Sequence, residues 1–168
     1  PQRSIKIHQM LTVRPNLSTT TKIEIYKSLA MDYEIIDSLF KAQKEAEQIL
    51  SIDKQNKWAL LFLLRIGEKK EDWDYAEDKA RKLQKISGVP DLNILSKYIV
   101  KKSIDKIENS AFEEAESLLD KAINQAPTYG LPYKYLGDIR MKNRDLVKAI
   151  EYWEKFMDLS PEDSNLVF

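Results

Sequence analysis

The chain has 168 residues, of which 43% are hydrophobic, so it is large enough to bury the core of one or two domains. Its 27 Lys and Arg residues balance its 27 Asp and Glu residues, and this balance gives no overall field to attract nucleic acid or an anionic membrane. The absence of cysteine excludes disulfides, thiolate zinc sites and a cysteine nucleophile, while four glycines and many Ala, Leu, Ile, Lys and Glu residues favour helices over sheets.

The first predicted element is an amphipathic helix within residues 1–15. The segment from Ser4 to Leu11 forms it, and Pro15 ends it. Its pattern is typical of the second helix of a helical hairpin. Because the sequence starts at Pro1, inside this helix and without a cap, we expect a fragment in which the first helix of that hairpin is missing.

Alanines recur at a fixed spacing in the segments that follow. Ala42 and Ala76 are 34 residues apart, and Ala115 and Ala149 are again 34 residues apart. This period is typical of tetratricopeptide repeats, in which every repeat is one helix–turn–helix hairpin. The sequence therefore predicts an all-α fold, a right-handed superhelical stack of such hairpins in a single solenoid. The expected repeats span residues 23–56, 57–90, 96–129 and 130–163, and residues 164–168 are expected to start a further repeat.

The alanine spacing grows to 39 between Ala76 and Ala115. The five extra residues fall in the sequence Ser-Gly-Val-Pro-Asp at positions 87–91, which stops a helix. We therefore expect a longer turn between the second and third repeats.

Side-chain size gives a physical reason for the repeat. Small residues let the two helices of a hairpin approach closely, and large residues fill the groove beside them. The last repeat fits this pattern best and fails only at Arg140, where a large apolar residue is expected. In the second repeat the large and small residues are exchanged at Leu64 and Gly67. In the third repeat Lys102 and Lys106 take positions that are usually apolar.

Two strings resemble the lipopolysaccharide assembly protein B family. They are SIKIHQMLTVRPNL at residues 4–17 and LLRIGEKKEDWDYAEDKARKL at residues 63–83, in which Gly67 replaces the tyrosine usual in that family. Residues 110–161 resemble the middle repeats of the same family, although their pattern occurs in many tetratricopeptide proteins.

The resemblance implies a location and a role. Members of the family are bacterial inner-membrane proteins with an amino-terminal anchor helix, cytoplasmic repeats and a carboxy-terminal rubredoxin-like zinc ribbon. The implied role is a membrane-associated adaptor that regulates lipopolysaccharide (lipid A) synthesis by presenting a biosynthetic enzyme to a protease. A generic tetratricopeptide adaptor or co-chaperone in secretion or complex assembly is the alternative, and a regulatory subunit bound to an enzyme is a third class.

The sequence offers little for catalysis or for cofactors. His8 is the single histidine, and acidic residues alternate with lysines along the predicted helices as they do on solvated faces. No glycine-rich phosphate loop is present. We therefore expect a protein that is not an enzyme, with no catalytic residues, no cofactor and no metal, and His8 is expected to be structural.

The concave surface of the predicted stack is the expected binding site. Aromatic and cationic residues are mixed there, which suits a protein or peptide ligand with apolar anchors and some acidic character. The expected residues are Lys27, Met31, Trp58, Leu61, Phe62, Arg65, Lys97, Lys101, Lys134, Tyr135, Asp138 and Met141.

Some of these residues have a second interpretation. Trp58 and Phe62 could equally pack against neighbouring helices. Lys27, Lys97 and Lys101 fit the lysines of a carboxylate clamp, but Met31 and Phe62 replace its asparagines. Nucleic acid and direct membrane insertion are not expected, whereas the uncapped ends are expected to pair with another copy.

Overall fold

The computed structural model describes residues 2–162, and within that range it contains nine α-helices and no strand. The predicted start of a further repeat at 164–168 lies outside the described residues. The helices are α1 (Gln2–Thr12), α2 (Thr19–Ile35), α3 (Leu39–Ile52), α4 (Lys57–Lys69), α5 (Trp73–Ser87), α6 (Leu92–Glu108), α7 (Phe112–Gln125), α8 (Leu131–Lys142) and α9 (Leu146–Leu159).

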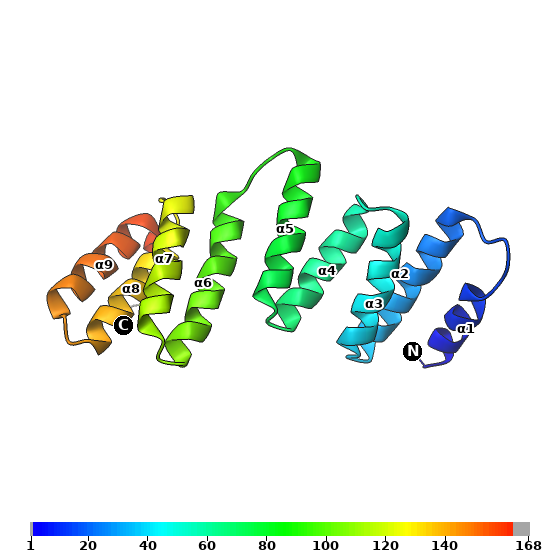
Figure 1. The fold of residues 1–168 in the computed structure, drawn as a ribbon, viewed down its shortest axis with the longest axis horizontal. Coiled ribbons are helices and arrows are strands. Elements are labelled where there is room, and N and C mark those ends of the chain that lie inside the picture. The colour runs from blue at the N-terminus through cyan, green and yellow to red at the C-terminus, as the bar shows by residue number, and fades with distance from the viewer. Residues whose placement is uncertain (1, 163–168) are drawn as a thin grey trace. The chain divides into compact units, whose positions relative to one another are not determined.

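The chain divides into two compact units, Pro1–Val89 and Pro90–Phe168. The first unit holds α1 to α5, and the second holds α6 to α9. In each unit, successive helices pair as antiparallel hairpins, namely α2 with α3, α4 with α5, α6 with α7 and α8 with α9 (Figure 1). The predicted all-α hairpin fold is confirmed, and its continuity as one solenoid over the whole chain stays a prediction.

The four alanines of the sequence period lie in the core. Ala42, Ala76, Ala115 and Ala149 are all 0% exposed, and each lies on the second helix of its hairpin. Gly67 makes a similar close approach in the α4–α5 hairpin, because a Cβ atom at this position would lie 3.2 Å from the backbone nitrogen of Ala76. The exchange of large and small residues in this repeat therefore moves the tight contact by one helical turn.

The turn inside each hairpin also repeats. A residue other than glycine adopts a left-handed conformation just before the N-cap of each second helix, with φ between 56° and 62°. These residues are Asp37, Glu71, Ser110 and Arg144. The residue after each one donates its backbone N–H to a carbonyl five residues earlier, as in Ser38 to Tyr33 at 2.9 Å. This bond satisfies a carbonyl at the end of each first helix and fixes the reversal of the chain.

The boundary between the two units falls in the predicted insertion. α5 ends at Ser87, and Gly88 follows with φ of 71°, a conformation that glycine adopts without steric cost. Asp91 then caps α6 by accepting a hydrogen bond from the backbone N–H of Ile94 at 3.0 Å.

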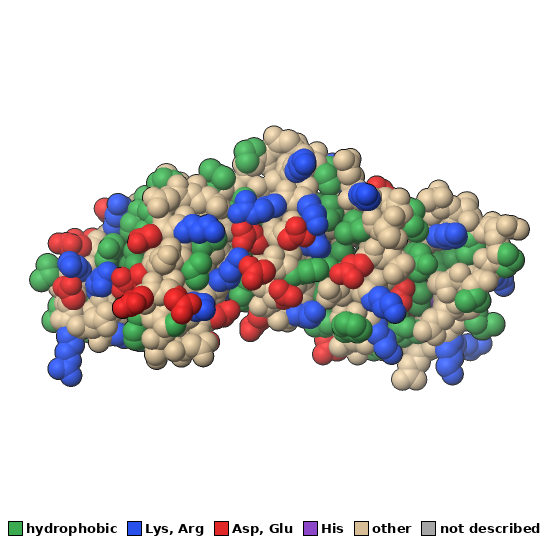
Figure 2. Space-filling model, viewed as in Figure 1, with side chains coloured by type: hydrophobic (Ala, Val, Ile, Leu, Met, Phe, Trp, Pro, Cys, Tyr) green, Lys and Arg blue, Asp and Glu red, His purple; other side chains and the backbone are tan. Residues whose placement is uncertain are grey.

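None of the helices in residues 2–162 combines the length and the apolar character that crossing a bilayer requires. Figure 2 shows Lys and Arg side chains interspersed with Asp and Glu side chains on the visible face, so a single sign of charge does not dominate it.

Candidate protein-interaction surface

In the first unit, the predicted site residues of α2 and α4 lie on one surface. Lys27 and Met31 are one turn apart on α2, and the Nζ atom of Lys27 lies 5.4 Å from the ring centroid of Trp58 on α4. Leu61 and Arg65 continue the same face of α4. Met31 is 47% exposed and Leu61 is 56% exposed, so both offer apolar area to a partner.

Phe62 is a correction to the sequence analysis. Its side chain is only 3% exposed and belongs to the hydrophobic core of the first unit. The ring stacks on Trp58 with centroids 5.0 Å apart and an interplanar angle of 22°, and the guanidinium of Arg65 lies over it at 5.2 Å. Phe62 therefore supports the surface from below and cannot contact a partner itself.

Two ion pairs join α2 to α4 on this surface. Glu34 of α2 accepts from Arg65 at 2.6 Å through one carboxylate oxygen and from Lys69 at 2.6 Å through the other. The Glu34 side chain is only 16% exposed, whereas both cations are about half exposed. The exposed sides of Arg65 and Lys69 therefore remain accessible to an acidic group of a partner.

We call this set the α2–α4 surface. It comprises Lys27, Met31, Glu34, Trp58, Leu61, Arg65 and Lys69. Sequence reasoning missed Glu34 and Lys69. The helical spacing held the signal, because both residues fall on the same faces of α2 and α4 as residues that were selected.

The second unit brings together a separate group on α8. Lys134 forms an ion pair with Asp138 at 2.6 Å, and its Nζ atom lies 4.7 Å from the ring centroid of Tyr135. The indole N–H of Trp153 donates to Asp138 at 3.2 Å. Burial raises the pKa of the Tyr135 phenol, Lys134 opposes this rise, and the negative charges of Asp138 and Glu108 add to it. Tyr135 is therefore a neutral hydrogen-bonding group at physiological pH.

The remaining predicted residues lie on neighbouring positions of the second unit. α6 and α8 pack against each other. Lys97 of α6 is exposed and lies 5.5 Å from the ring centroid of Tyr98, Lys101 follows one turn later, and Met141 on α8 is 48% exposed. A single groove that joins this group to the α2–α4 surface stays a prediction.

His8 takes part in a polar contact between α1 and α2. Its Nδ1 atom lies 2.9 Å from Oδ2 of Asp32, and the Ser4 hydroxyl donates to the same carboxylate oxygen at 2.8 Å. In a catalytic triad the serine and the carboxylate meet opposite nitrogens of the imidazole. Here the Ser4 hydroxyl is 3.4 Å from Nδ1, the nitrogen that faces Asp32. This arrangement ties α1 to α2 and does not activate a nucleophile.

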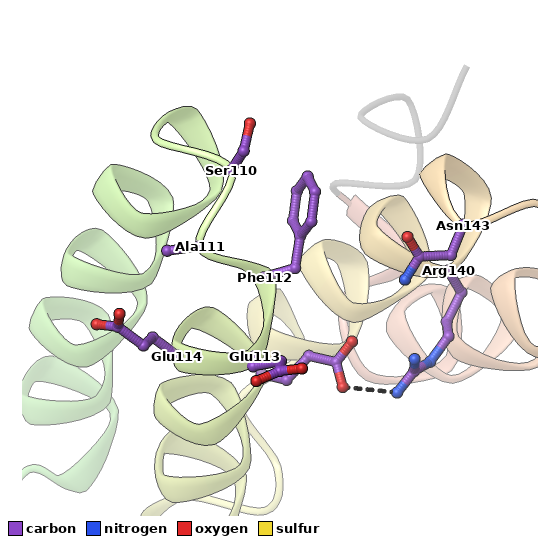
Figure 3. Close-up of a pocket in the computed structure, with 8 residues that line it drawn as sticks. Ser110, Ala111, Phe112, Glu113, Glu114, Arg140 and Asn143 are labelled. Atoms are coloured by element: carbon purple, nitrogen blue, oxygen red, sulfur yellow. Dashed lines mark hydrogen bonds and ion pairs between the residues drawn. The ribbon is translucent and has the colours of Figure 1, made fainter.

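No three His, Asp or Glu side chains among residues 2–162 are arranged so that they could hold a metal ion. A recess of about 640 Å³ lies at the α6–α7 turn and the C-terminal end of α8. Figure 3 shows Phe112 of α7, Arg140 of α8 and Asn143, the residue that follows α8, around it. Arg140 pairs across the recess with Glu116 at 2.8 Å. This pair links α7 to α8 at the position where the sequence pattern expected an apolar residue.

The sequence of this chain resembles that of a known protein. No protein-family model matches the chain. Lipopolysaccharide assembly protein B from Haemophilus influenzae is 27% identical over 162 residues, which is 95% of this chain. The chain spans about 40% of the length of that protein.

Two solved structures resemble the fold. The MamA RS-1 ArsTM double mutant covers 97% of this chain with a TM-score of 0.50 and 12% identity, and the likeness extends over 86% of that structure. The structure of MamA MSR-1 C2 covers 96% of this chain, again with a TM-score of 0.50 and 12% identity, and 88% of that structure is included. At this identity the likeness concerns the fold alone. The chain is thus a stack of α-helical hairpins whose sequence resembles lipopolysaccharide assembly protein B.

Proposed function

We propose that this chain is a protein-interaction scaffold that binds its partner through the α2–α4 surface. The observation that carries the proposal is the exposure of Met31 and Leu61 beside cations that the partly buried carboxylate of Glu34 holds in place. Apolar anchors surrounded by fixed polar groups are the usual composition of a protein-binding site. The core beneath this surface, with Phe62 at 3% exposure, gives the anchors a rigid base.

The resemblance to lipopolysaccharide assembly protein B supports a more specific role. In this proposal the chain is part of a membrane-associated adaptor on the cytoplasmic side of the inner membrane. The adaptor presents the deacetylase that commits precursors to lipid A synthesis to a membrane protease. In this proposal the chain supplies the recognition surface, and the chemistry belongs to the two partners.

A binding measurement with purified partners tests both levels of the proposal. The double variant Met31→Glu/Leu61→Glu places two charges on the apolar anchors, so we expect its affinity for the deacetylase to fall roughly 10- to 100-fold relative to the unmodified chain. The matched control is Val89→Glu, which changes an exposed apolar residue (68% exposed) outside the surface and should bind normally. Biolayer interferometry with immobilised chain gives the dissociation constants.

The outcomes separate the two levels. Equal binding by the double variant and the control would contradict the assignment of the α2–α4 surface. If the unmodified chain bound neither the deacetylase nor the protease, the role in lipid A synthesis would fail. A scaffold for a different partner, as in a generic adaptor or co-chaperone, would then be the better description.

A further inference from the structure

Three large apolar side chains are exposed together at the turn of the α2–α3 hairpin. Ile35 is the last residue of α2, Ile36 follows it, and Phe40 is the second residue of α3. Their exposed fractions are 68%, 42% and 75% respectively. We call these three residues the α2–α3 tip. Clustered exposed apolar residues indicate an interaction site, whereas single ones are ordinary.

The other hairpins have polar residues at the same positions. Each turn contains one left-handed residue, Asp37 in the first and Glu71 in the second, and these residues align the turns. The equivalents of the α2–α3 tip in the α4–α5 hairpin are then Lys69, Lys70 and Asp74, which are all exposed. In the α6–α7 hairpin they are Glu108, Asn109 and Glu113, which are exposed as well. The hairpin fold therefore does not require apolar residues at this tip.

Packing of one hairpin on the next does not cover these positions. The α2–α3 hairpin packs against α4, and the α6–α7 hairpin packs against α8. The equivalents of the tip in the α4–α5 and α8–α9 hairpins are nevertheless exposed, and in the second case they are Lys142, Asn143 and Val147. A neighbouring hairpin thus leaves the turn open to solvent, so the apolar side chains of the α2–α3 tip are available to a partner.

The exposed apolar side chains of the tip continue along α2. Met31 lies one turn before Ile35 on the same face of the helix and is 47% exposed. Met31 belongs to the α2–α4 surface, so this surface and the α2–α3 tip share one apolar strip, which comprises Met31, Ile35, Ile36 and Phe40. The strip follows a helix and then a turn, so its shape is elongated.

The charged side chains of α4 beside this strip are cations. Arg65 and Lys69 are 55% and 48% exposed, whereas Glu34, which pairs with both, is only 16% exposed. A partner therefore meets the guanidinium and the amine more readily than the carboxylate. Asp37, at the apex of the turn, is exposed. Carboxylates of a partner are thus favoured along α4 and disfavoured at the apex.

We propose that the apolar strip binds an amphipathic helix of a partner protein, whose carboxylates face Arg65 and Lys69. This inference rests on the proposed function, because it names the chemistry of the partner segment and extends its contact to the α2–α3 tip. A helix suits an elongated strip because its apolar residues recur on one face. An anionic membrane fits less well, because its phosphates would meet the carboxylate of Asp37 at the apex.

Fluorescence anisotropy with a labelled peptide tests this proposal. The probe is an amphipathic peptide of about 18 residues, with leucine on one face, glutamate beside it and alanine elsewhere, which is long enough to form a helix. The variant Ile35→Lys/Ile36→Lys/Phe40→Asp gives the α2–α3 tip the residue types of the α4–α5 turn, so it should fold normally. We expect this variant to bind the probe roughly tenfold more weakly than the unmodified chain, because three apolar contacts are lost.

Two comparisons control the measurement. A second peptide with lysine in place of glutamate should bind the unmodified chain about tenfold more weakly than the first, because Arg65 and Lys69 repel it. Val89→Glu changes an exposed apolar residue outside the strip and should leave the affinity unchanged. Circular dichroism of each variant checks that the helices are retained.

Three results would overturn the proposal. The unmodified chain could fail to bind the acidic peptide or bind both peptides equally. The tip variant could bind the acidic peptide as strongly as the unmodified chain does. The unmodified chain could bind vesicles of anionic phospholipid through the tip and neither peptide, which would assign the tip to a lipid surface. The measurement with the deacetylase is separate, so the α2–α4 surface can be confirmed there while the tip fails here.

Discussion

Replacing Phe156 with alanine is expected to lower the free energy of unfolding of the second unit by about 3–5 kcal/mol. Phe156 is 0% exposed and is among the largest fully buried side chains of the described chain. Its ring lies under Gly130, where an added Cβ atom would be 3.3 Å from Cδ2 of the phenylalanine. Truncation removes this packing and leaves a cavity that neighbouring helices fill only in part.

Urea unfolding followed by circular dichroism measures this loss. The matched control is Val147→Ala, which shortens an apolar residue of the same helix that is 69% exposed. The control should change the free energy of unfolding by no more than about 0.5 kcal/mol. If the two variants lost similar stability, Phe156 would not be a core residue of the α8–α9 hairpin.

The second large effect is expected for Gly137→Leu, with a net loss of roughly 2 kcal/mol. A Cβ atom at Gly137 would lie 2.4 Å from Cδ1 and Nε1 of Trp153, so any side chain forces the indole to move. The movement also breaks the hydrogen bond from Trp153 to Asp138. Helix propensity acts in the opposite direction, because leucine is better than glycine in a helix by about 1 kcal/mol. The steric cost of about 3 kcal/mol is larger and decides the sign.

A double-mutant cycle identifies the cause of this loss. In a Trp153→Ala background, Gly137→Leu should cost less, because the space that the indole occupied can accept the leucine. The free energies come from the same urea titration. A stability gain from Gly137→Leu in the unmodified chain would mean that propensity outweighs packing at this position, contrary to our expectation.

Much of the fold could be predicted from side-chain size and spacing. Ala42 and Ala149 were selected from their period alone, and both are fully buried on second helices. The period reveals which residues are buried, because the same steric requirement recurs in each hairpin. The turns before the second helices follow the same period, but their residues differ in type from Asp37 to Arg144. Residue type therefore gave no signal of their left-handed backbone.

The candidate site was harder to predict from the sequence than the fold was. The helical position of Phe62 is compatible with either a groove or a core, and burial depends on how α4 rests against its neighbours. Glu34 pairs with Arg65, which is 31 positions later in the sequence, and with Lys69, which is 35 positions later. A single sequence gives no sign of such pairs. The recess beside Arg140 depends on the geometry of a turn and a helix end that side-chain size does not specify.

The fold also explains why these surfaces are available. The buried small residues hold the hairpins together, so the outward faces of α2 and α4 are not needed for the core. Met31 and Leu61 can therefore be apolar and exposed without loss of the hairpin.

Methyl NOE spectroscopy on alanine-labelled chain tests the steric basis of the account most directly. Interproton contacts from the methyl groups of Ala42, Ala76, Ala115 and Ala149 are expected to reach the first helix of the same hairpin, respectively α2, α4, α6 and α8. Contacts confined to their own helices, or to unrelated neighbours in the four cases, would contradict the claim that the recurring alanines bring the paired helices together.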